Sequence, residues 1–107
     1  MIKEITVEEL KDKRENNEDF LLLDVREEFE FMVSNLDGEL IPLGQLQNRI
    51  KEIEKYKDQE VVIMCRSGGR SSRAVQLLQN QGFDTVYNLK GGMKAWAKQI
   101  EPGTPVA

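Results

Sequence analysis

The sequence contains no histidine and only one cysteine, Cys65. Without histidine the chain cannot use a Cys-His or Ser-His pair, in which the imidazole takes the proton of the nucleophile. A single cysteine cannot form an intrachain disulfide, and most zinc sites need histidine or several cysteines, so we expect no metal site. If Cys65 is a nucleophile, its thiolate must therefore be stabilised by the surrounding charges and dipoles alone.

Long apolar segments and an excess of positive charge are also lacking. The net charge of −4 argues against general binding to nucleic acid or to an anionic membrane. No apolar stretch approaches the length of a membrane span, and residues 1–4 lack the apolar core of a signal peptide. We therefore expect a cytoplasmic protein. The length of 107 residues is that of one ordinary domain, which we expect to be monomeric.

Apolar patterns along the chain predict alternating strands and helices. Apolar runs predict buried strands at residues 20–25, 61–65 and 85–89. Helices are expected at residues 7–14, 27–32, from 43 onward, 71–81 and 93–98. This alternation is typical of an α/β sheet with parallel pairings and helices on both faces. Three methionines are expected in the core, namely Met32, Met64 and Met93.

The expected domain covers residues 1–101, and residues 102–107, which contain two prolines and a glycine, are expected to form a flexible tail. In parallel α/β sheets, ligands bind beyond the carboxyl ends of the strands. Cys65 ends one predicted strand, and Asp24 lies near the end of another. We expect both side chains at the same edge of the sheet.

The segment after Cys65 has the composition of an anion-binding loop. Glycines allow consecutive backbone amides to converge on one anion, and the N-terminus of the following helix adds about half a positive charge. Arg66 and Arg70 add full charges that can hold an oxyanion. Such a loop would lower the pKa of the Cys65 thiol. The alternative is that Cys65 is a small buried apolar residue and that the glycines only turn the chain.

Two familiar anion loops do not fit the spacing. A Gly-x4-Gly-Lys-Ser/Thr loop needs its lysine, and there is none between Cys65 and Lys90. A Cys-x5-Arg phosphatase loop would need arginine at position 71. That position is Ser71, and Arg70 comes one residue too early. The count therefore argues against a phosphatase.

The segment from Cys65 to Ser71 resembles the active-site loop of the rhodanese-like sulfurtransferases. Two further segments resemble the signatures of that family, Asp24-Val25-Arg26 with Glu30-Phe31, and Gly82-Phe83 with Val86, Leu89, Gly91-Gly92 and Trp96. The resemblance implies a three-layer rhodanese-like fold with a central, mostly parallel five-stranded sheet and helices on both faces. The chain departs from the family at Ser34-Asn35-Leu36, where Gly-His-Ile is common.

The resemblance implies transfer of a sulfane sulfur through a persulfide on Cys65. The donor would be a small anion, thiosulfate or polysulfide, and the acceptor a thiol, cyanide or a sulfur-accepting protein. The donor would be bound by the loop residues Arg66, Ser67, Gly68, Gly69, Arg70 and Ser71. Asp24 and Arg26 are expected to support the loop by hydrogen bonds rather than to react.

No cofactor is expected for this chemistry, because the thiolate itself carries the sulfur. The sequence also allows other functions. The chain could be a non-catalytic persulfide carrier or a module that recruits a partner. A phosphatase or arsenate reductase would share the layout, although the chain has no second cysteine to resolve a thiol intermediate. An activated lone cysteine could also act as a redox sensor.

Overall fold

A computed structural model describes residues 2–107 and contains a five-stranded sheet in the order β1-β5-β4-β2-β3. Every neighbouring pair of strands in this sheet is parallel. The strands are β1 (Lys3–Ile5), β2 (Phe20–Asp24), β3 (Glu39–Leu40), β4 (Glu60–Met64) and β5 (Thr85–Leu89). The three strands expected from apolar runs are confirmed, and so is the five-stranded sheet implied by the resemblance.

The helices also follow the expected order. They are α1 (Val7–Glu15), α2 (Glu28–Val33), α3 (Leu43–Leu46), the 3-10 helix η1 (Gln47–Tyr56), α4 (Gly69–Asn80) and α5 (Gly92–Gln99). A capping box starts α1, in which the Thr6 hydroxyl accepts from the Glu9 amide and the Glu9 carboxylate accepts from the Thr6 amide. Within residues 2–107, none of the helices combines the length and the apolar character needed to span a bilayer.

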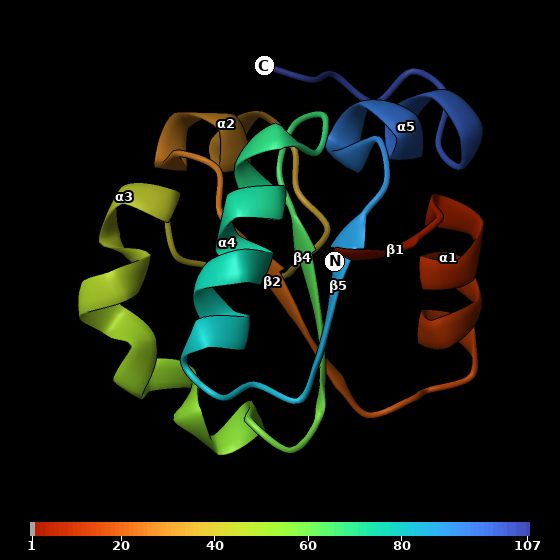
Figure 1. The fold of residues 1–107 in the computed structure, drawn as a ribbon. Helices are drawn as coiled ribbons and strands as arrows, with labels where there is room; N and C mark the ends of the chain where they lie inside the picture. Colours follow the sequence, from red (N-terminus) through yellow and green to blue (C-terminus); the bar gives the residue numbers. More distant parts are fainter. Residues whose placement is uncertain (1) are drawn as a thin grey trace.

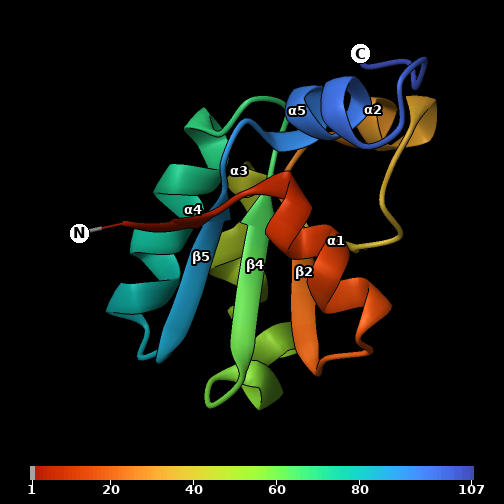
Figure 2. The same ribbon diagram turned by 90° about the vertical axis from the view of Figure 1, so that its right-hand side faces the viewer.

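The two faces of the sheet are covered by different helices. Along β4 and the residue after it, Val61, Ile63 and Cys65 belong to one buried cluster, whereas Val62 and Met64 belong to the other. Helices α3, η1 and α4 cover the first face, and α1 and α5 cover the second (Figures 1 and 2). This is the three-layer arrangement that the sequence predicts.

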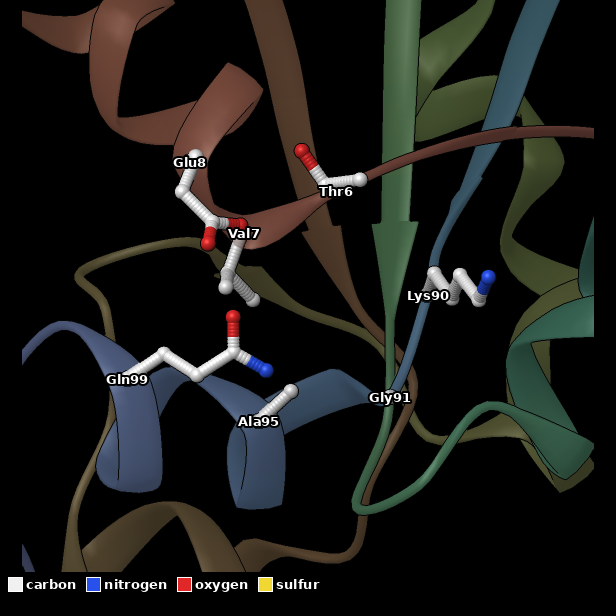
Figure 3. Close-up of a pocket in the computed structure, with 7 residues that line it drawn as sticks. All are labelled: Thr6, Val7, Glu8, Lys90, Gly91, Ala95 and Gln99. Carbon is white, nitrogen blue, oxygen red and sulfur yellow. The ribbon is translucent and has the colours of Figure 1, made fainter.

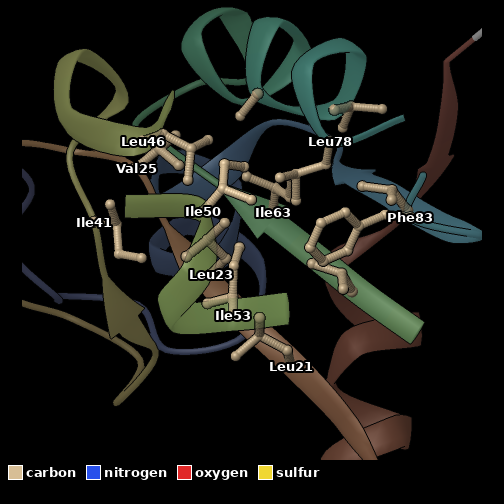
Figure 4. Close-up of a cluster of buried hydrophobic side chains, with 14 of the residues drawn as sticks. Leu21, Leu23, Val25, Ile41, Leu46, Ile50, Ile53, Ile63, Leu78 and Phe83 are labelled. Atoms are coloured by element: carbon tan, nitrogen blue, oxygen red, sulfur yellow. The ribbon is translucent and has the colours of Figure 1, made fainter. Parts of the chain in front are cut away.

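The cluster on the α4 face fills the space between the sheet and three helical segments. Figure 4 shows Leu23 and Ile63 from the sheet packed against Ile53 of η1 and Leu78 of α4. All four side chains are fully buried. Their burial fixes α4 to the sheet, and α4 begins next to Cys65. The core of the domain thus determines where this helix points.

Two strands and one side chain depart from the expectations. The short strands β1 and β3 were not predicted from apolar patterning, because they have only three and two residues. The prediction that Met32 lies in the core is wrong, since this side chain is 76% exposed. It lies on the short helix α2 with two further exposed apolar residues, Phe29 and Val33. Met64 and Met93 are fully buried, as expected.

The carboxyl ends of the strands lie at one end of the molecule, together with α2, the start of α5 and the C-terminus (Figures 1 and 2). Residues 102–107 lie at this end, where Val106 packs against the second buried cluster and the Pro105 carbonyl accepts from the Ser34 hydroxyl. The expected flexibility of residues 102–107, and the domain boundary at residue 101, stay predictions.

Gly92 allows α5 to start directly against the loop that follows β4. Its φ of +56° is in the left-handed region, and a Cβ atom there would clash with the Cys65 carbonyl oxygen and lie 2.8 Å from the Arg66 carbonyl carbon. We expect Gly92→Ala to lower the free energy of unfolding by about 1–3 kcal/mol, measured by urea unfolding.

Gly44→Ala is the matched control, because a Cβ at Gly44 in α3 would meet no atom within 4 Å. Alanine there should leave the stability unchanged or raise it by up to about 1 kcal/mol. Equal stabilities for the two variants would contradict the close approach of α5 to the loop.

Candidate functional site

The sulfur of Cys65 receives hydrogen bonds from the loop that follows it. The Gly68 amide nitrogen lies 3.1 Å from Sγ and the Ser71 amide nitrogen 3.4 Å from it. The Ser71 hydroxyl oxygen lies 3.3 Å from Sγ. Cys65 is only 1% exposed. The sulfur is therefore buried, but it is surrounded by polar donors rather than by hydrocarbon alone.

The backbone conformation of Gly68 makes this geometry possible. Gly68 has a φ of +113° and is the N-cap of α4, so a side chain at this position would strain the turn. Its carbonyl accepts the first helical hydrogen bond from the Ser72 amide at 3.1 Å, and a second one from the Ser72 hydroxyl at 2.8 Å. The helix therefore begins immediately after the turn, and the Ser71 amide, which has no partner within the helix, donates to the sulfur.

Helix α5 hydrogen-bonds to the backbone carbonyls at the start of the same loop. The Met93 amide donates to the Cys65 carbonyl at 2.9 Å, and the Lys94 amide donates to the Arg66 carbonyl at 3.0 Å. These bonds fix the carbonyls toward α5 and leave the amides of the following residues free to turn toward the sulfur. The loop is thus held between the first turns of α4 and α5.

Opposing effects act on the Cys65 thiol. Burial raises its pKa, whereas hydrogen bonds from the Ser71 hydroxyl and from the amides of Ser71, Gly68 and Ser67 lower it. The lowering effects prevail, and the pKa lies below the ordinary value of a cysteine. This supports an activated thiol over the alternative in which Cys65 is only a small buried apolar residue.

Arg70 and Glu30 form a two-armed ion pair at the rim of the site. Nη1 and Nη2 of Arg70 lie 2.6 and 2.8 Å from the two carboxylate oxygens of Glu30. The pair connects α4 to α2. The Arg70 guanidinium lowers the pKa of Glu30 from its usual 4.5 to about 2, against the effect of burial. The charge of Cys65 also contributes to the raised pKa of Arg70.

Asp24 and Arg26 form a fully buried ion pair beside α2. Arg26 Nε lies 3.0 Å from one oxygen of Asp24, and Nη2 lies 2.8 Å from the other. Arg26 also donates to the carbonyls of Glu30 and Ser34. The structure therefore places this pair under α2, where it supports the helix that carries Glu30. It does not bring either side chain into a hydrogen bond with Cys65.

The remaining loop residues lie at the surface or face the end of the chain. Arg66 Nε donates to the Ala107 carbonyl at 2.7 Å. Ser67 and Gly69 are exposed. Of the loop residues expected at the site, Gly68 and Ser71 hydrogen-bond to the Cys65 sulfur, whereas the side chains of the two arginines have other protein partners.

The segment that departs from the family pattern closes α2. Asn35 Nδ2 donates to the Phe31 carbonyl at 3.1 Å, and Asn35 Oδ1 accepts from the Asp37 amide at 2.8 Å. Leu36 is buried in the cluster on the α1 face. Asn35 therefore holds the turn after α2 by hydrogen bonds on both sides.

Sequence reasoning missed the parts played by Glu30 and Asn88. Glu30 was noted only as part of the first family signature, and its partner Arg70 is 40 residues away. Asn88 accepts a hydrogen bond from Ser71 through its side-chain carbonyl. The only sequence signal for Asn88 was a polar residue within an otherwise apolar strand.

A separate pocket lies between the start of α1 and the face of α5 (Figure 3). Its lining consists of Thr6, Val7, Glu8, Lys90, Gly91, Ala95 and Gln99. None of these residues belongs to the loop from Cys65 to Ser71. The lining contains no cysteine, so this pocket is separate from the thiol and from its loop.

Comparison with known proteins identifies the family. The model of the family described as "Rhodanese-like domain" matches residues 6–99. The chain belongs to this family. It is 40% identical over 103 residues to a protein of Allochromatium vinosum named "Sulfurtransferase", covering 95% of this chain and 94% of that protein. It is 39% identical over 102 residues to "Putative sulfurtransferase YtwF" of Bacillus subtilis, covering 94% and 96%.

Solved structures agree with this assignment. A rhodanese-like domain protein from Staphylococcus aureus superposes with a TM-score of 0.83 at 28% identity, covering 99% of each chain. Some curated relatives are much longer: the chain is 34% identical to the maize protein "Adenylyltransferase and sulfurtransferase MOCS3-1" but spans only 23% of its length. The full-length matches named as sulfurtransferases support sulfur transfer as the general activity of this rhodanese-like domain.

The ion pair between Glu30 and Arg70 should make stability depend on pH in the acid range. The folded pKa of Glu30 lies below its unfolded value of 4.5, so its contribution is fully present above pH 4.5 and is lost as the pH falls toward 2. We expect about 2 kcal/mol of stability to be lost over this range, less than the full linkage value because Arg70 is partly in water.

The measurement is urea unfolding across that pH range for the native chain and for Glu30→Gln, which should lack this part of the pH dependence. Glu52→Gln, which breaks the exposed pair with Arg49, is the control and should change the slope little. A Glu30→Gln variant with an unchanged slope would contradict the role of the ion pair.

Proposed function

We propose that this rhodanese-like domain is a sulfurtransferase that moves a sulfane sulfur from an anionic donor, thiosulfate or polysulfide, to a thiophilic acceptor through a persulfide on Cys65. The observation that carries the proposal is the convergence of the Gly68 and Ser71 amides on the Cys65 sulfur. This arrangement stabilises a sulfur anion without a base, as a chain without histidine requires.

The reaction takes place in two steps that balance without an added oxidant. In the first, the Cys65 thiolate attacks the outer sulfur of thiosulfate, a bond forms between the two sulfurs, and the original sulfur–sulfur bond breaks. Its electron pair leaves with sulfite. In the second step, an acceptor thiolate or cyanide attacks the outer sulfur of the persulfide, and the bond to Sγ breaks. Cys65 returns as a thiolate, which is the pattern of a ping-pong reaction.

The loop residues have separate proposed roles in these steps. The amides from Gly68 to Ser71 stabilise the negative charge on the thiolate and then on the persulfide, because preorganised dipoles act on charge as it develops. Arg66 and Arg70 attract the anionic donor and hold its oxygen atoms. Nη1 and Nη2 of Arg70 remain paired with Glu30, and this pairing keeps the Arg70 guanidinium at the rim of the site.

The donor can reach the sulfur only if surrounding residues move, because Cys65 is only 1% exposed. The contact between Arg66 and the Ala107 carbonyl is part of the surface around the loop. We propose that residues 102–107 move away when the donor binds, which would free the Arg66 guanidinium. This step agrees with the expected flexibility of the tail.

A persulfide on Cys65 can be observed directly. After incubation with thiosulfate and removal of excess donor, intact-protein mass spectrometry should show the gain of one sulfur atom per chain. Cys65→Ser is the matched control and should gain none. The absence of the added sulfur on the native chain, with thiosulfate and with polysulfide as donors, would contradict the proposed function.

One observation favours a second candidate, a non-catalytic persulfide carrier or partner-recruiting module. Helix α2, which contributes Glu30 to the rim of the site, exposes Phe29, Met32 and Val33. Exposed apolar side chains that lie together often mark a surface for another protein. A protein acceptor could use this patch to reach the persulfide.

Steady-state kinetics separates the two candidates. A sulfurtransferase should turn over many times with thiosulfate as the donor and cyanide as the acceptor. A carrier should load once and keep its sulfur in the presence of cyanide, releasing it only to a specific protein.

A further inference from the structure

Asn88 is a buried polar residue on β5 beside the Cys65 loop. It pairs in register with Ile63 of β4, so its side chain lies on the same face of the sheet as Ile63 and Cys65, under the start of α4. On its other side it pairs with Glu4 of β1. Asn88 is only 2% exposed, so all of its polar atoms must find partners within the protein.

The surroundings fix which way the Asn88 amide points. Its Nδ2 lies 3.0 Å from the Ser72 hydroxyl oxygen, 3.3 Å from the Gly68 carbonyl oxygen and 3.4 Å from a Glu4 carboxylate oxygen. The Gly68 carbonyl and the Glu4 carboxylate can only accept hydrogen bonds. A reversed amide would press Oδ1 against both of them. Oδ1 must therefore face the hydroxyl of Ser71.

In this orientation of the amide, Asn88 depends on the hydroxyl proton of Ser71. Oδ1 of Asn88 carries no proton, so its hydrogen bond with Ser71 uses the single proton of the Ser71 hydroxyl. The same hydroxyl oxygen lies 3.3 Å from the Cys65 sulfur. While Cys65 is a neutral thiol, its S–H can donate to Ser71, and every contact is satisfied. Once Cys65 ionises, the sulfur also needs a donor, and only one proton is available for two acceptors.

We propose that Asn88 is a positioning residue that holds back the ionisation of Cys65, because its Oδ1 competes with the sulfur for the single hydroxyl proton of Ser71. The inference deepens the proposed function and rests on the role of Cys65 as the nucleophile. The amides of Gly68 and Ser71 donate to the sulfur in either state. Asn88 thus limits how far the other donors can lower the pKa of Cys65.

A limit of this kind has a chemical use. The nucleophilicity of a thiolate falls as its pKa falls, and attack is fastest when the pKa lies near the ambient pH. A thiolate that received the full Ser71 hydrogen bond in addition to the amides would be more abundant but less reactive. Competition from Asn88 keeps the pKa of Cys65 above the value that the full Ser71 hydrogen bond would give, so the thiolate stays a stronger nucleophile.

Charged groups on several elements also act on this sulfur. Arg70 on α4 acts on it electrostatically, and Glu30 on α2 partly neutralises Arg70. Glu4 on β1 touches the Asn88 amide, and Arg66 directly follows Cys65 in the chain. Substitution of Asn88 or Ser71 leaves all four charged groups in place. Their fields therefore cancel in comparisons between such variants.

The test is a double-mutant cycle in which the pKa of Cys65 is read from the pH dependence of its alkylation by iodoacetamide. The four proteins are the native chain, Ser71→Ala, Asn88→Leu and the double variant. We expect Ser71→Ala to raise the pKa by roughly half a unit to one unit more in the Asn88→Leu background than in the native background, because the Ser71 proton then serves the sulfur alone.

Any loosening of the loop by Asn88→Leu is present on both sides of that comparison and cancels. An equal or smaller effect of Ser71→Ala in the Asn88→Leu background would overturn the proposal. Alkylation requires no sulfur transfer, so this result is independent of whether the domain accepts sulfur from thiosulfate.

A second measurement uses the native chain and does not depend on the folding of Asn88→Leu. In a nuclear magnetic resonance titration, the carbon shift of Asn88 Cγ should change with the same midpoint as Cys65 ionisation, because the thiolate then shares the Ser71 proton with Oδ1 and weakens that hydrogen bond. The change should disappear in Ser71→Ala. No change in the native chain, or an equal change in Ser71→Ala, would overturn the proposal.

Discussion

The direction of the backbone amides after Cys65 is the constraint on which the ionisation of this thiol depends. The amides of Gly68 and Ser71 both point at the sulfur, and burial alone would have favoured the neutral thiol. The chain has no histidine that could take the proton instead. Left-handed backbone at Gly68 and the immediate start of α4 are what turn these amides inward. A buried cysteine can therefore be a nucleophile here without a base.

Segments that are distant in sequence hold this loop in place. The first amides of α5 donate to the Cys65 and Arg66 carbonyls. The amides on the opposite side of the loop can therefore face the sulfur. The pair between Arg70 and Glu30 ties the first turn of α4 to α2. From the sheet, Asn88 contacts both the turn and the first turn of α4. The fold thus determines the chemistry of the thiol through contacts on three sides.

Much of this arrangement could be predicted from the sequence, because its signals are local. Continuous apolar runs indicate β4 and β5, and the glycines after Cys65 indicate a turn that can bind an anion. The short strands β1 and β3 carry too few residues for a pattern and exist because they pair with β5 and β2. The ion pair of Glu30 with Arg70 depends on the packing of α2 near α4. Met32 was misplaced because α2 lies at the end of the molecule beside the carboxyl ends of the strands, and its apolar side chains Phe29, Met32 and Val33 are exposed there.

Titration of the Cys65 thiolate tests the central claim most directly. The ultraviolet absorbance of the thiolate is followed with pH in the native chain, and the same titration of Cys65→Ser is subtracted to remove the tyrosine signal. An amide-stabilised sulfur predicts a midpoint clearly below about 8.5, the value of a free cysteine. A midpoint at or above that value would contradict the account, because burial would then outweigh the hydrogen bonds from the loop.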